Sequence, residues 1–495
     1  MKRRTVLAMT AVAVVTFTAG AAWSAGDFGS TRDQLLASQT QKLFGINAPL
    51  AASSTTSADP DDAADDPTKL VTLAKGLEAH VVTPVEGQDA AAPVVDMIAL
   101  WPNDSAPTHL IFCNEDGATD PGVQRLDLES GDVETILTGT ISCDPAHVTP
   151  WGTIVFAEEN GGGANGGRLY EMIDPLHTTN VQLDRTTGAI TNGSGGEGAS
   201  NIVTRPALGI LSYEGIGVLP NGVVYFGDEQ RPGNGTPGGA YFKFIPATLR
   251  DPNAGSISEL SRSPLVSGSV YGMRLGKRSG NTDYGQGTEF GMGIWVAVSG
   301  TTMGTPPAVD LRAFTAAQKL TGYYRPEDLA FDRAAMAAGT VRFCGNNTGN
   351  ESDDHLWGNT VCVTDGTLAQ AATPTSTPEA QLFVQGSSQF AMMDNVAYQP
   401  GRGNWVIHED GASSTTGRNN DLWDCLPDGG DDDTLSDGCI RVGTINDLGP
   451  AGAPNEDDPA EWTGGVFDAT GTHLFVSIQH NMTGDGVILD ITGWK

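Results

Sequence analysis

Positive charge is scarce in this sequence. Its 495 residues include 27 lysines and arginines against 60 aspartates and glutamates, which gives a formal net charge of −33. Loss of the basic head Lys2-Arg3-Arg4 would make this −36, that is −33 minus 3. Such a surface repels nucleic acid and anionic membranes. We therefore expect no nucleic-acid partner and a protein suited to a salty or calcium-containing medium, although acidity that serves solubility alone is the alternative.

Long apolar runs are also scarce. The one candidate extends from Val6 to about Ala22, behind the basic head, and ends in small residues before Ala25, which is typical of a signal peptide. It is too short for a stable membrane span, and no later stretch is long enough. Residues 3–7 resemble a twin-arginine export signal, with a general secretory signal as the alternative. We predict that residues 1–24 are a signal peptide and that the protein is exported, periplasmic or extracellular.

Several catalytic signatures are missing. The glycine-rich stretch 160–167 has no following Lys-Ser/Thr, so it is not a phosphate loop. The acidic stretch 428–437 lacks the EF-hand spacing, and no His-rich zinc motif occurs. No Gly-x-Ser-x-Gly lies in a convincing strand–turn–helix setting. These absences argue against a P-loop enzyme, a zinc hydrolase and a serine hydrolase.

Cysteine is limited to six residues, an even count that agrees with export. Six cysteines allow about 15 connectivities, and we favour the sequential one because its pairs flank successive strands or close short loops. The predicted disulfides are Cys113–Cys143, Cys344–Cys362 and Cys425–Cys439. The alternative leaves Cys143 as a free thiolate metal ligand.

Glycine, in contrast, is abundant, with 64 residues, and β-branched and aromatic residues gather in short runs. This composition favours an all-β fold with many tight turns. A short helix is expected between Asp33 and Phe44, and another from Asp310 as N-cap to Leu320. We divide the chain into an N-terminal helix and linker (25–67) and one β-propeller domain with decorated loops (68–495), and we expect a monomer.

A hairpin with acidic or amide residues at its open end recurs along the chain. One copy begins at Glu214, turns at Pro-Asn-Gly and ends at Asp228 and Glu229. Other copies begin near Pro145, at Glu327, at Asp394 and at Gly464. In an antiparallel hairpin the start of one strand lies beside the end of the next, so a radial arrangement would gather these ends on one face. Such a face suits a hard cation, which takes six to eight oxygen ligands.

The candidate ligands share this place at the open ends of the hairpins. They are Glu158, Glu159, Glu214, Asp228, Glu229, Glu327, Asp328, Asn346, Asp394, Asn395, Glu409 and Asp410. An acidic residue at a strand end is more often a solvated charge than a ligand. The recurrence at one structural place is what favours calcium.

These segments carry a resemblance to a known family. The matching motifs are Thr149-Pro-Trp-Gly-Thr153 with Glu158-Glu159-Asn160, Tyr213-Glu214-Gly215 with Gly227-Asp228-Glu229, Arg325-Pro326-Glu327, Asn346-Asn347-Thr348, Asp394-Asn395 and Ser477-Ile478-Gln479-His480. In this order, over roughly residues 68–490, they resemble the PhoX-type alkaline phosphatases, a family of exported β-propellers. The resemblance implies a six-bladed propeller, a cluster of calcium ions with iron, and hydrolysis of a small phosphate ester.

The resemblance also implies roles for individual residues. Glu214 and Glu327 would be metal ligands, and Arg325 would be the catalytic cation that faces the substrate phosphate. Further ligand oxygens would come from Glu158, Glu159, Asp228 and Asp394. The alternative for Arg325 is a salt bridge to Asp328 or Asp332.

Two positions depart from the family pattern. Ala157 stands where the family has a cysteine able to bind iron, and Gly349 stands where it often has a basic residue. The sequence therefore predicts calcium and makes iron doubtful, in a divergent or weakly active family member.

Two other functions remain open. One is a calcium-dependent lactonase or esterase that uses Glu214, Asp394 and Asn395 with His408 or His480. The other is a non-catalytic binding propeller with structural calcium.

Overall fold

The computed structural model describes residues 28–83, 91–232, 237–276, 289–298, 309–349, 357–411, 413–429, 431–448 and 459–495. The predicted signal peptide lies outside these residues, and the domain division at residue 67 stays a prediction. Among the described residues, no helix is both long and apolar enough to cross a bilayer.

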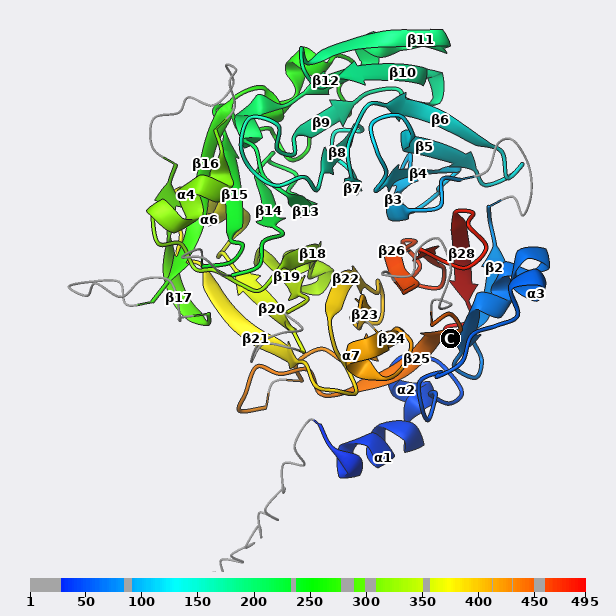
Figure 1. Cartoon of the computed structure of the whole chain (residues 1–495). Helices are drawn as coiled ribbons and strands as arrows, with labels where there is room; N and C mark the ends of the chain where they lie inside the picture. Colours follow the sequence, from blue (N-terminus) through cyan, green and yellow to red (C-terminus); the bar gives the residue numbers. More distant parts are fainter. Residues whose placement is uncertain are drawn as a thin grey trace, which may run out of the picture.

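The strands of the described residues form five hydrogen-bonded sheets arranged radially around a central axis (Figure 1). The first sheet contains β3 (Val95–Trp101), β4 (His109–Asn114), β5 (Pro121–Asp127), β6 (Val133–Thr138), β10 (Thr179–Asp184) and β11 (Ala189–Glu197). The second contains β7 (Cys143–Val148), β8 (Ile154–Glu158), β9 (Leu169–Met172) and β12 (Ile202–Thr204). The all-β prediction is confirmed by this architecture.

The third sheet has nine strands: β13 (Tyr213–Val218), β14 (Val224–Asp228), β15 (Tyr241–Pro246), β16 (Gly268–Leu275), β17 (Gly291–Ala297), β18 (Pro326–Phe331), β19 (Arg342–Asn347), β20 (Asn359–Thr364) and β21 (Glu379–Gln385). Its two halves meet where β17 pairs with β21 over only two residue pairs. The fourth sheet contains β1 (Val71–Leu73), β22 (Met393–Tyr398), β23 (Trp405–Glu409), β24 (Asp421–Cys425) and β25 (Cys439–Ile445). The fifth contains β2 (Glu78–Val81), β26 (Glu461–Phe467), β27 (Leu474–Gln479) and β28 (Val487–Thr492).

Six strands line the central axis. They are β3, β7, β13, β18, β22 and β26; each contacts the next, and β26 contacts β3, so the inner ring is closed. Each inner strand begins an antiparallel hairpin. Apolar clusters fill the spaces between neighbouring sheets, as with Phe156 and Tyr170 of the second sheet against Ile111 of the first. Because neighbouring sheets cover both of their faces, inner strands such as β13 and their neighbours β8, β14 and β27 are buried throughout, whereas the outer strand β11 is polar and largely exposed.

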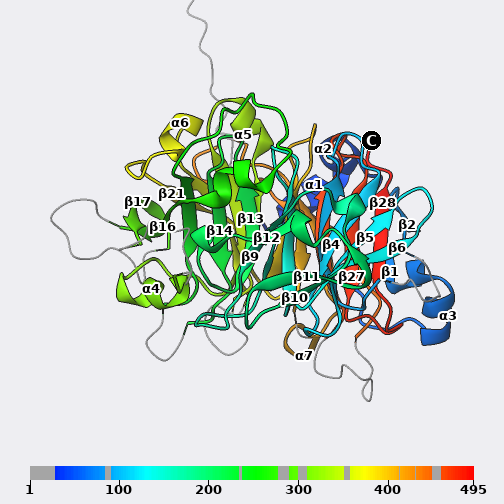
Figure 2. The same cartoon turned by 90° about the horizontal axis from the view of Figure 1, so that it is seen from above.

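Helices occupy the periphery and the two ends of the axis (Figure 2). The α-helices are α1 (Ser30–Ser38), α2 (Thr40–Phe44), α3 (Pro60–Asp65), α4 (Leu311–Ala317), α5 (Arg333–Ala337), α6 (Leu368–Ala371) and α7 (Ser413–Thr416). The 3₁₀ helices are Pro67–Leu70, Pro175–His177, Ala199–Asn201, Pro206–Leu208, Leu260–Arg262 and Pro264–Val266. The predicted cap is confirmed, because the Asp310 side chain accepts a hydrogen bond from the backbone N–H of Ala313. The first predicted helix is two helices, which meet at Gln39.

The N-terminal segment completes two sheets at the other end of the chain. β1 pairs with β25, and β2 pairs with β28, both antiparallel. Leu36 and Phe44, from α1 and α2, are buried in the apolar cluster that these two sheets share. The segment therefore covers strand edges that would otherwise be open.

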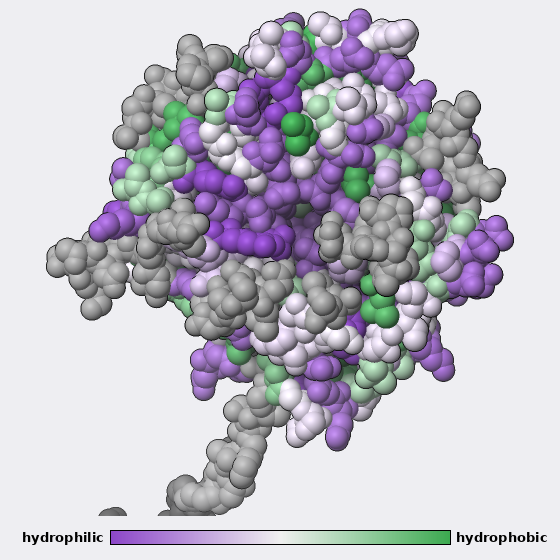
Figure 3. Space-filling view, in the orientation of Figure 1, coloured by the Kyte–Doolittle hydropathy of each residue, from purple (hydrophilic) through white to green (hydrophobic). Residues whose placement is uncertain are grey.

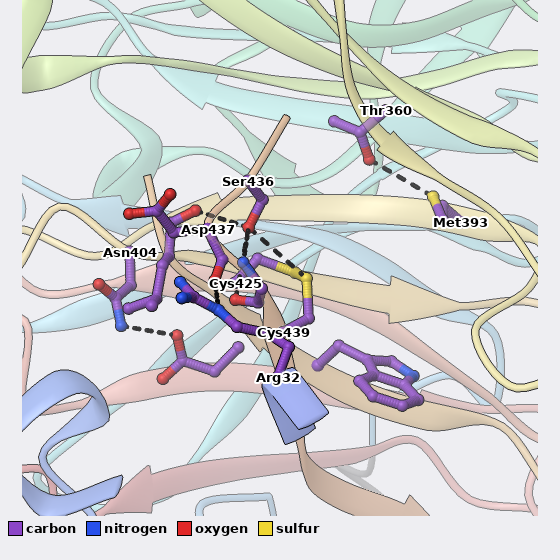
Figure 4. Close-up of a disulfide and its surroundings, with 12 residues drawn as sticks. Arg32, Thr360, Met393, Asn404, Cys425, Ser436, Asp437 and Cys439 are labelled. Atoms are coloured by element: carbon purple, nitrogen blue, oxygen red, sulfur yellow. Dashed lines mark hydrogen bonds between the residues drawn. A yellow bond between two sulfur atoms is a disulfide. The ribbon is translucent and has the colours of Figure 1, made fainter. Parts of the chain in front are cut away.

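The six cysteines are paired in the predicted sequential order, with Cα–Cα distances of 5.0, 3.9 and 4.0 Å. Cys113–Cys143 joins β4 to β7 and thus the first sheet to the second, so Cys143 is not a free thiolate. The other two disulfides each join residues directly opposite on neighbouring strands. Around Cys425–Cys439, Ser436 donates to the carbonyl of Leu426, and Arg32 of α1 donates to the carbonyl of Asp437 (Figure 4).

Non-reducing peptide mapping is expected to recover these three pairs. The double variant Cys113→Ser/Cys143→Ser should lose about 3 kcal/mol of unfolding free energy, because the disulfide closes a long loop and ties two sheets. Denaturant unfolding measures this loss. The matched pair Cys425→Ser/Cys439→Ser closes a shorter loop within one sheet and should lose less. An equal loss in both double variants would contradict the expectation.

Candidate metal centre

Each inner hairpin carries a bulge at the same place. The register shifts lie between Val95 and Ile98, Cys143 and Ala146, Tyr213 and Ile216, Pro326 and Leu329, Met393 and Val396, and Thr463 and Val466. Two residues there face one on the partner strand, which re-aims the side chains. The first of the two is Asp96, Asp144, Glu214, Glu327, Asp394 or Gly464. Five inner strands therefore present a carboxylate at an equivalent position.

Further carboxylates join these five in one ring. Glu115, Glu159 and Asp410 directly follow β4, β8 and β23, and Glu461 begins β26. Four overlapping groups have ligand oxygens within 4.8 Å of one another: Asp96, Glu115 and Asp144; Asp144, Glu159 and Glu214; Glu214, Glu327 and Asp394; Asp394, Asp410 and Glu461. We call these nine residues the carboxylate ring. The ring lies on the face that bears α7, and this face is hollowed at its centre, with hydrophilic residues around the hollow (Figure 3).

Burial and mutual repulsion dominate the electrostatics of the ring. Burial, followed by the neighbouring carboxylates, raises the pKa of Asp96, Glu214 and Asp394 well above the usual range. Burial raises the pKa of Glu327 to about 8, against the opposing effect of Arg325. The Oδ1 atoms of Asp96 and Asp144 have no hydrogen-bond partner in the described part of the chain. Buried, unpartnered carboxylate oxygens are costly unless a cation binds them, so the donor set fits a hard divalent ion.

Arg325 provides a cation at the edge of the ring. Its Nε atom lies 2.7 Å from Glu229 and 3.2 Å from Glu327, and its Nη2 atom lies 3.8 Å from Asp410. Burial opposes its charge, but Glu327, Glu229 and Asp410 raise the guanidinium pKa well above its ordinary value. Its φ is +57°, a left-handed conformation that costs a non-glycine residue about 1 kcal/mol or more. The guanidinium thus stays charged and is held in place, with 16% of the side chain exposed.

The salt bridges proposed as an alternative for Arg325 are not formed. The carboxylate of Asp328 accepts hydrogen bonds from the backbone N–H groups of Leu329 and Val396. Asp332 pairs with Arg342 instead.

Comparisons with known proteins identify the family of the chain. The family described as alkaline phosphatase PhoX matches residues 118–481. The chain belongs to the PhoX alkaline phosphatase family. Pseudomonas fluorescens PhoX in complex with vanadate, a transition state analogue, is similar with 17% identity and a TM-score of 0.58, over 90% of this chain and 98% of that one.

Other solved structures are less similar to this PhoX family member. A putative oxidoreductase (glucose dehydrogenase) from Thermus thermophilus has 11% identity and a TM-score of 0.40, over 84% of this chain and 100% of that one. An α-L-arabinanase from Penicillium chrysogenum, complexed with arabinobiose, has 10% identity and a TM-score of 0.38, over 84% of this chain and 98% of that one. No curated protein sequence matches the chain.

The structure brings together four of the six metal ligands predicted from the PhoX resemblance. Glu159, Glu214, Glu327 and Asp394 are members of the carboxylate ring. Glu158 and Asp228 lie outside it, because they are engaged in ion pairs with Arg185 and Arg312. Among the wider candidates, Glu409 is likewise paired with Arg418, whereas Asp410 joins the ring. Since neighbouring strand residues point in opposite directions, only one of each acidic pair faces the axis.

Glu158→Gln in this PhoX family member is therefore expected to leave the metal content unchanged. The Glu158 carboxylate accepts hydrogen bonds from the N–H groups of Ile141 and Arg168 and from the Tyr170 hydroxyl. Glu158→Ala should cost about 3 kcal/mol of unfolding free energy, because Arg185 loses its buried partner. Elemental analysis and thermal unfolding check both points, with Glu214→Gln as the matched variant that should lose metal. Loss of metal in Glu158→Gln would contradict the placement.

Sequence reasoning missed four members of the ring: Asp96, Glu115, Asp144 and Glu461. Asp144 directly precedes Pro145, near which one of the predicted hairpins begins. It occupies the bulge position equivalent to that of Glu214, and this equivalence could have identified it as a ligand. The β3–β4 hairpin was not recognised at all. In the β26–β27 hairpin the bulge consists of Gly464 and Gly465, and the carboxylate comes from three residues earlier.

Two histidines were candidates for a lactonase site. His408 is fully buried, and burial lowers its pKa to about 3. It packs against the bulge of β26, since a Cβ atom at Gly465 would lie 2.5 Å from its Cε1 atom. His480 lies nearer the ring, with Nε2 at 3.5 Å from Glu461 Oε1. Neither belongs to the groups of described residues whose ligand atoms converge.

Proposed function

We propose that this protein is a calcium-dependent phosphomonoesterase on a six-bladed propeller, with the carboxylate ring as its metal site and Arg325 as its phosphate contact. The observation that carries the proposal is the ring of nine carboxylates with a charged guanidinium at its edge, in a chain of the PhoX family. Six bulged inner hairpins around one axis support the blade count. Three disulfides support export by the segment 1–24. We further propose that the protein is a monomer.

Calcium fits the donors better than iron does. The ring offers carboxylate oxygens only, and these are the ligands that calcium prefers. Ala157 faces the bulge at Asp144 but is buried in an apolar cluster with Trp151 and Val155, so this position provides no ligand. Softer nitrogen or sulfur donors are absent from the convergent groups of described residues. We therefore propose calcium alone.

The chain's own residues would bind and orient the ester. Arg325 offers a planar pair of N–H donors that matches two phosphate oxygens. Glu229 holds this guanidinium at 2.7 Å, so its direction is fixed before substrate binds. The Thr348 hydroxyl donates to Glu327 at 2.6 Å and fixes that carboxylate. Bound calcium would supply the positive charge that stabilises the phosphoryl group as it is transferred.

Hydrolysis assays separate the three candidate functions. Purified protein is assayed with p-nitrophenyl phosphate and with a simple lactone, each with calcium, with iron or with a chelator. We expect phosphate-ester hydrolysis that requires calcium and is not increased by iron. Lactone hydrolysis alone would favour the lactonase, with His480 as the available base. Metal-dependent stability without either activity would favour the binding propeller.

A further inference from the structure

A small cavity of about 200 Å³ is lined in part by Tyr323 and Tyr324, the two residues that precede Arg325 in the chain. Its walls include three aromatic residues, Tyr323, Tyr324 and Trp357, and three amides, Asn347, Asn359 and Gln385. Small-molecule sites for drug-sized ligands have about 300–1,000 Å³. The cavity is smaller than these sites, so a single ring with its substituents is the size of ligand that it suits.

Backbone pairing places several residues of the cavity wall next to Arg325, along the chain and across the neighbouring strand. Tyr324 is the residue before Arg325, and its carbonyl accepts a hydrogen bond from Gly349 at 3.0 Å. The carbonyl of Arg325 accepts one from Thr348 at 3.1 Å, and Asn347 is the partner of Pro326. Asn359 and Gln385 continue the same row across β20 and β21. Neighbouring strands lie about 4.8 Å apart, so the cavity begins roughly one strand away from Arg325.

The polar groups of the cavity are held in fixed positions. Asn347 Nδ2 donates to Asn359 Oδ1 at 2.8 Å, and the Tyr241 hydroxyl donates to Asn347 Oδ1 at 3.3 Å. Gln385 Nε2 donates to the carbonyl of Gly358 at 3.3 Å. The amides are thus preorganised, which lowers the cost of ordering them around a ligand.

The chemistry of the walls selects an uncharged polar ring. Among the described residues of the lining, Glu289 is the one charged residue and is negative, so a second phosphate is disfavoured. Amide and carboxylate groups match the donors and acceptors of neighbouring hydroxyls. Aromatic faces pack against apolar ring surface. Hydroxyls around a ring with apolar C–H faces are the pattern of a sugar.

We propose that this cavity, the leaving-group cavity, receives the sugar ring of a sugar phosphate whose phosphate binds at Arg325. The inference rests on the proposed phosphomonoesterase function and names its substrate class. In this proposal, Trp357 and Asn359 contact the leaving group and determine which phosphate esters are preferred.

The test compares leaving groups in the calcium-loaded full-length protein. The ratio of kcat/KM for glucose 6-phosphate to that for glycerol 3-phosphate is measured for wild type, Trp357→Ala, Trp357→Phe and Asn359→Ala. We expect the ratio to fall about tenfold in Trp357→Ala and Asn359→Ala, and to recover largely in Trp357→Phe, which keeps an aromatic face. Asn253→Ala removes an exposed amide far along the chain and should leave the ratio unchanged.

Binding of free glucose, followed by saturation-transfer NMR, gives a readout that needs no turnover. We expect a signal in wild type that Trp357→Ala loses. If no phosphate ester is hydrolysed but this difference persists, the phosphatase proposal fails and the cavity remains a sugar site. Unchanged ratios in both alanine variants would overturn the proposal. Adenosine 5′-monophosphate is assayed with the same variants, and a fall in kcat/KM for this ester that is not found for glucose 6-phosphate would also overturn the proposal, because it would assign the cavity to a base.

Discussion

Calcium removal by a strong chelator at pH 8 is expected to lower the melting temperature by about 10 °C. An ion that binds only the native state at about 1,000 times its Kd contributes about 4 kcal/mol. One kcal/mol shifts the melting temperature of a large domain by about 2–4 °C. Without the ion, the ring carboxylates repel one another in a buried site. Scanning calorimetry with and without the chelator measures the shift.

Without calcium, the melting temperature of the protein should fall as the pH rises. Burial raises the pKa of native Glu327 to about 8, whereas an unfolded glutamate has a pKa of about 4.3. Between these values the native state binds more protons than the unfolded state, so stability falls as the pH rises. The chelated protein is therefore expected to melt higher at pH 5.5 than at pH 8.5. The calcium-loaded protein should not melt higher at pH 5.5 than at pH 8.5, because the ion favours the ionised form of the carboxylates.

A surface variant provides the control for both measurements. Glu129→Gln neutralises an exposed carboxylate in the turn between β5 and β6 and should leave the calcium effect intact. If chelation moves neither the melting temperature nor its pH dependence, and the purified protein contains no calcium, the ring is not a metal site.

Glu327→Ala and Arg325→Ala are expected to differ in both metal content and turnover. Glu327→Ala removes a ligand from the centre of the ring, so both metal content and turnover should be lost, with kcat/KM at least about 1,000-fold lower. Arg325→Ala removes no ligand, so metal content should persist. Its KM should rise about 100-fold, because two charge-assisted hydrogen bonds of about 1.5 kcal/mol each disappear. Elemental analysis and steady-state kinetics check the pair.

Arg325→Lys tests geometry separately from charge. Lysine keeps the charge but not the planar pair of donors, so its KM should lie between those of wild type and Arg325→Ala. Arg262→Ala, an exposed arginine paired with Glu259, is the matched control. If Arg325→Ala leaves the kinetics intact while Glu327→Ala abolishes them, the arginine is structural and the substrate is not bound through it.

The sequence was sufficient for five of the six inner hairpins and for the disulfides. Pro-Asn-Gly between two apolar runs predicts β13 and β14, and their pairing places Tyr213 opposite Asp228. Cys344 and Cys362 are likewise opposite one another on consecutive strands. Local patterns determine such contacts.

The sequence did not show which acidic side chains face the central axis. Glu158 and Glu159 are adjacent, and either residue could face the axis. The bulge at Asp144 breaks the two-residue alternation, and a shift of one residue exchanges the two faces of a strand. The ion pairs of Arg325 could not be predicted either, because its partners Glu229 and Asp410 come from two different hairpins. Contacts between hairpins leave no local trace in the sequence.

The pairing of β1 with β25 and of β2 with β28 has a consequence for the order of synthesis. Of the described strands, β1 and β2 come earliest in the chain but are among the last to find partners, because residues 439–445 and 487–492 must be translated before either pair can form. Until then both strands present bare edges, on which other chains can aggregate. The nascent chain therefore benefits from shielding until late in its translation, and a premature stop before residue 487 would release a protein in which β2 has no partner strand.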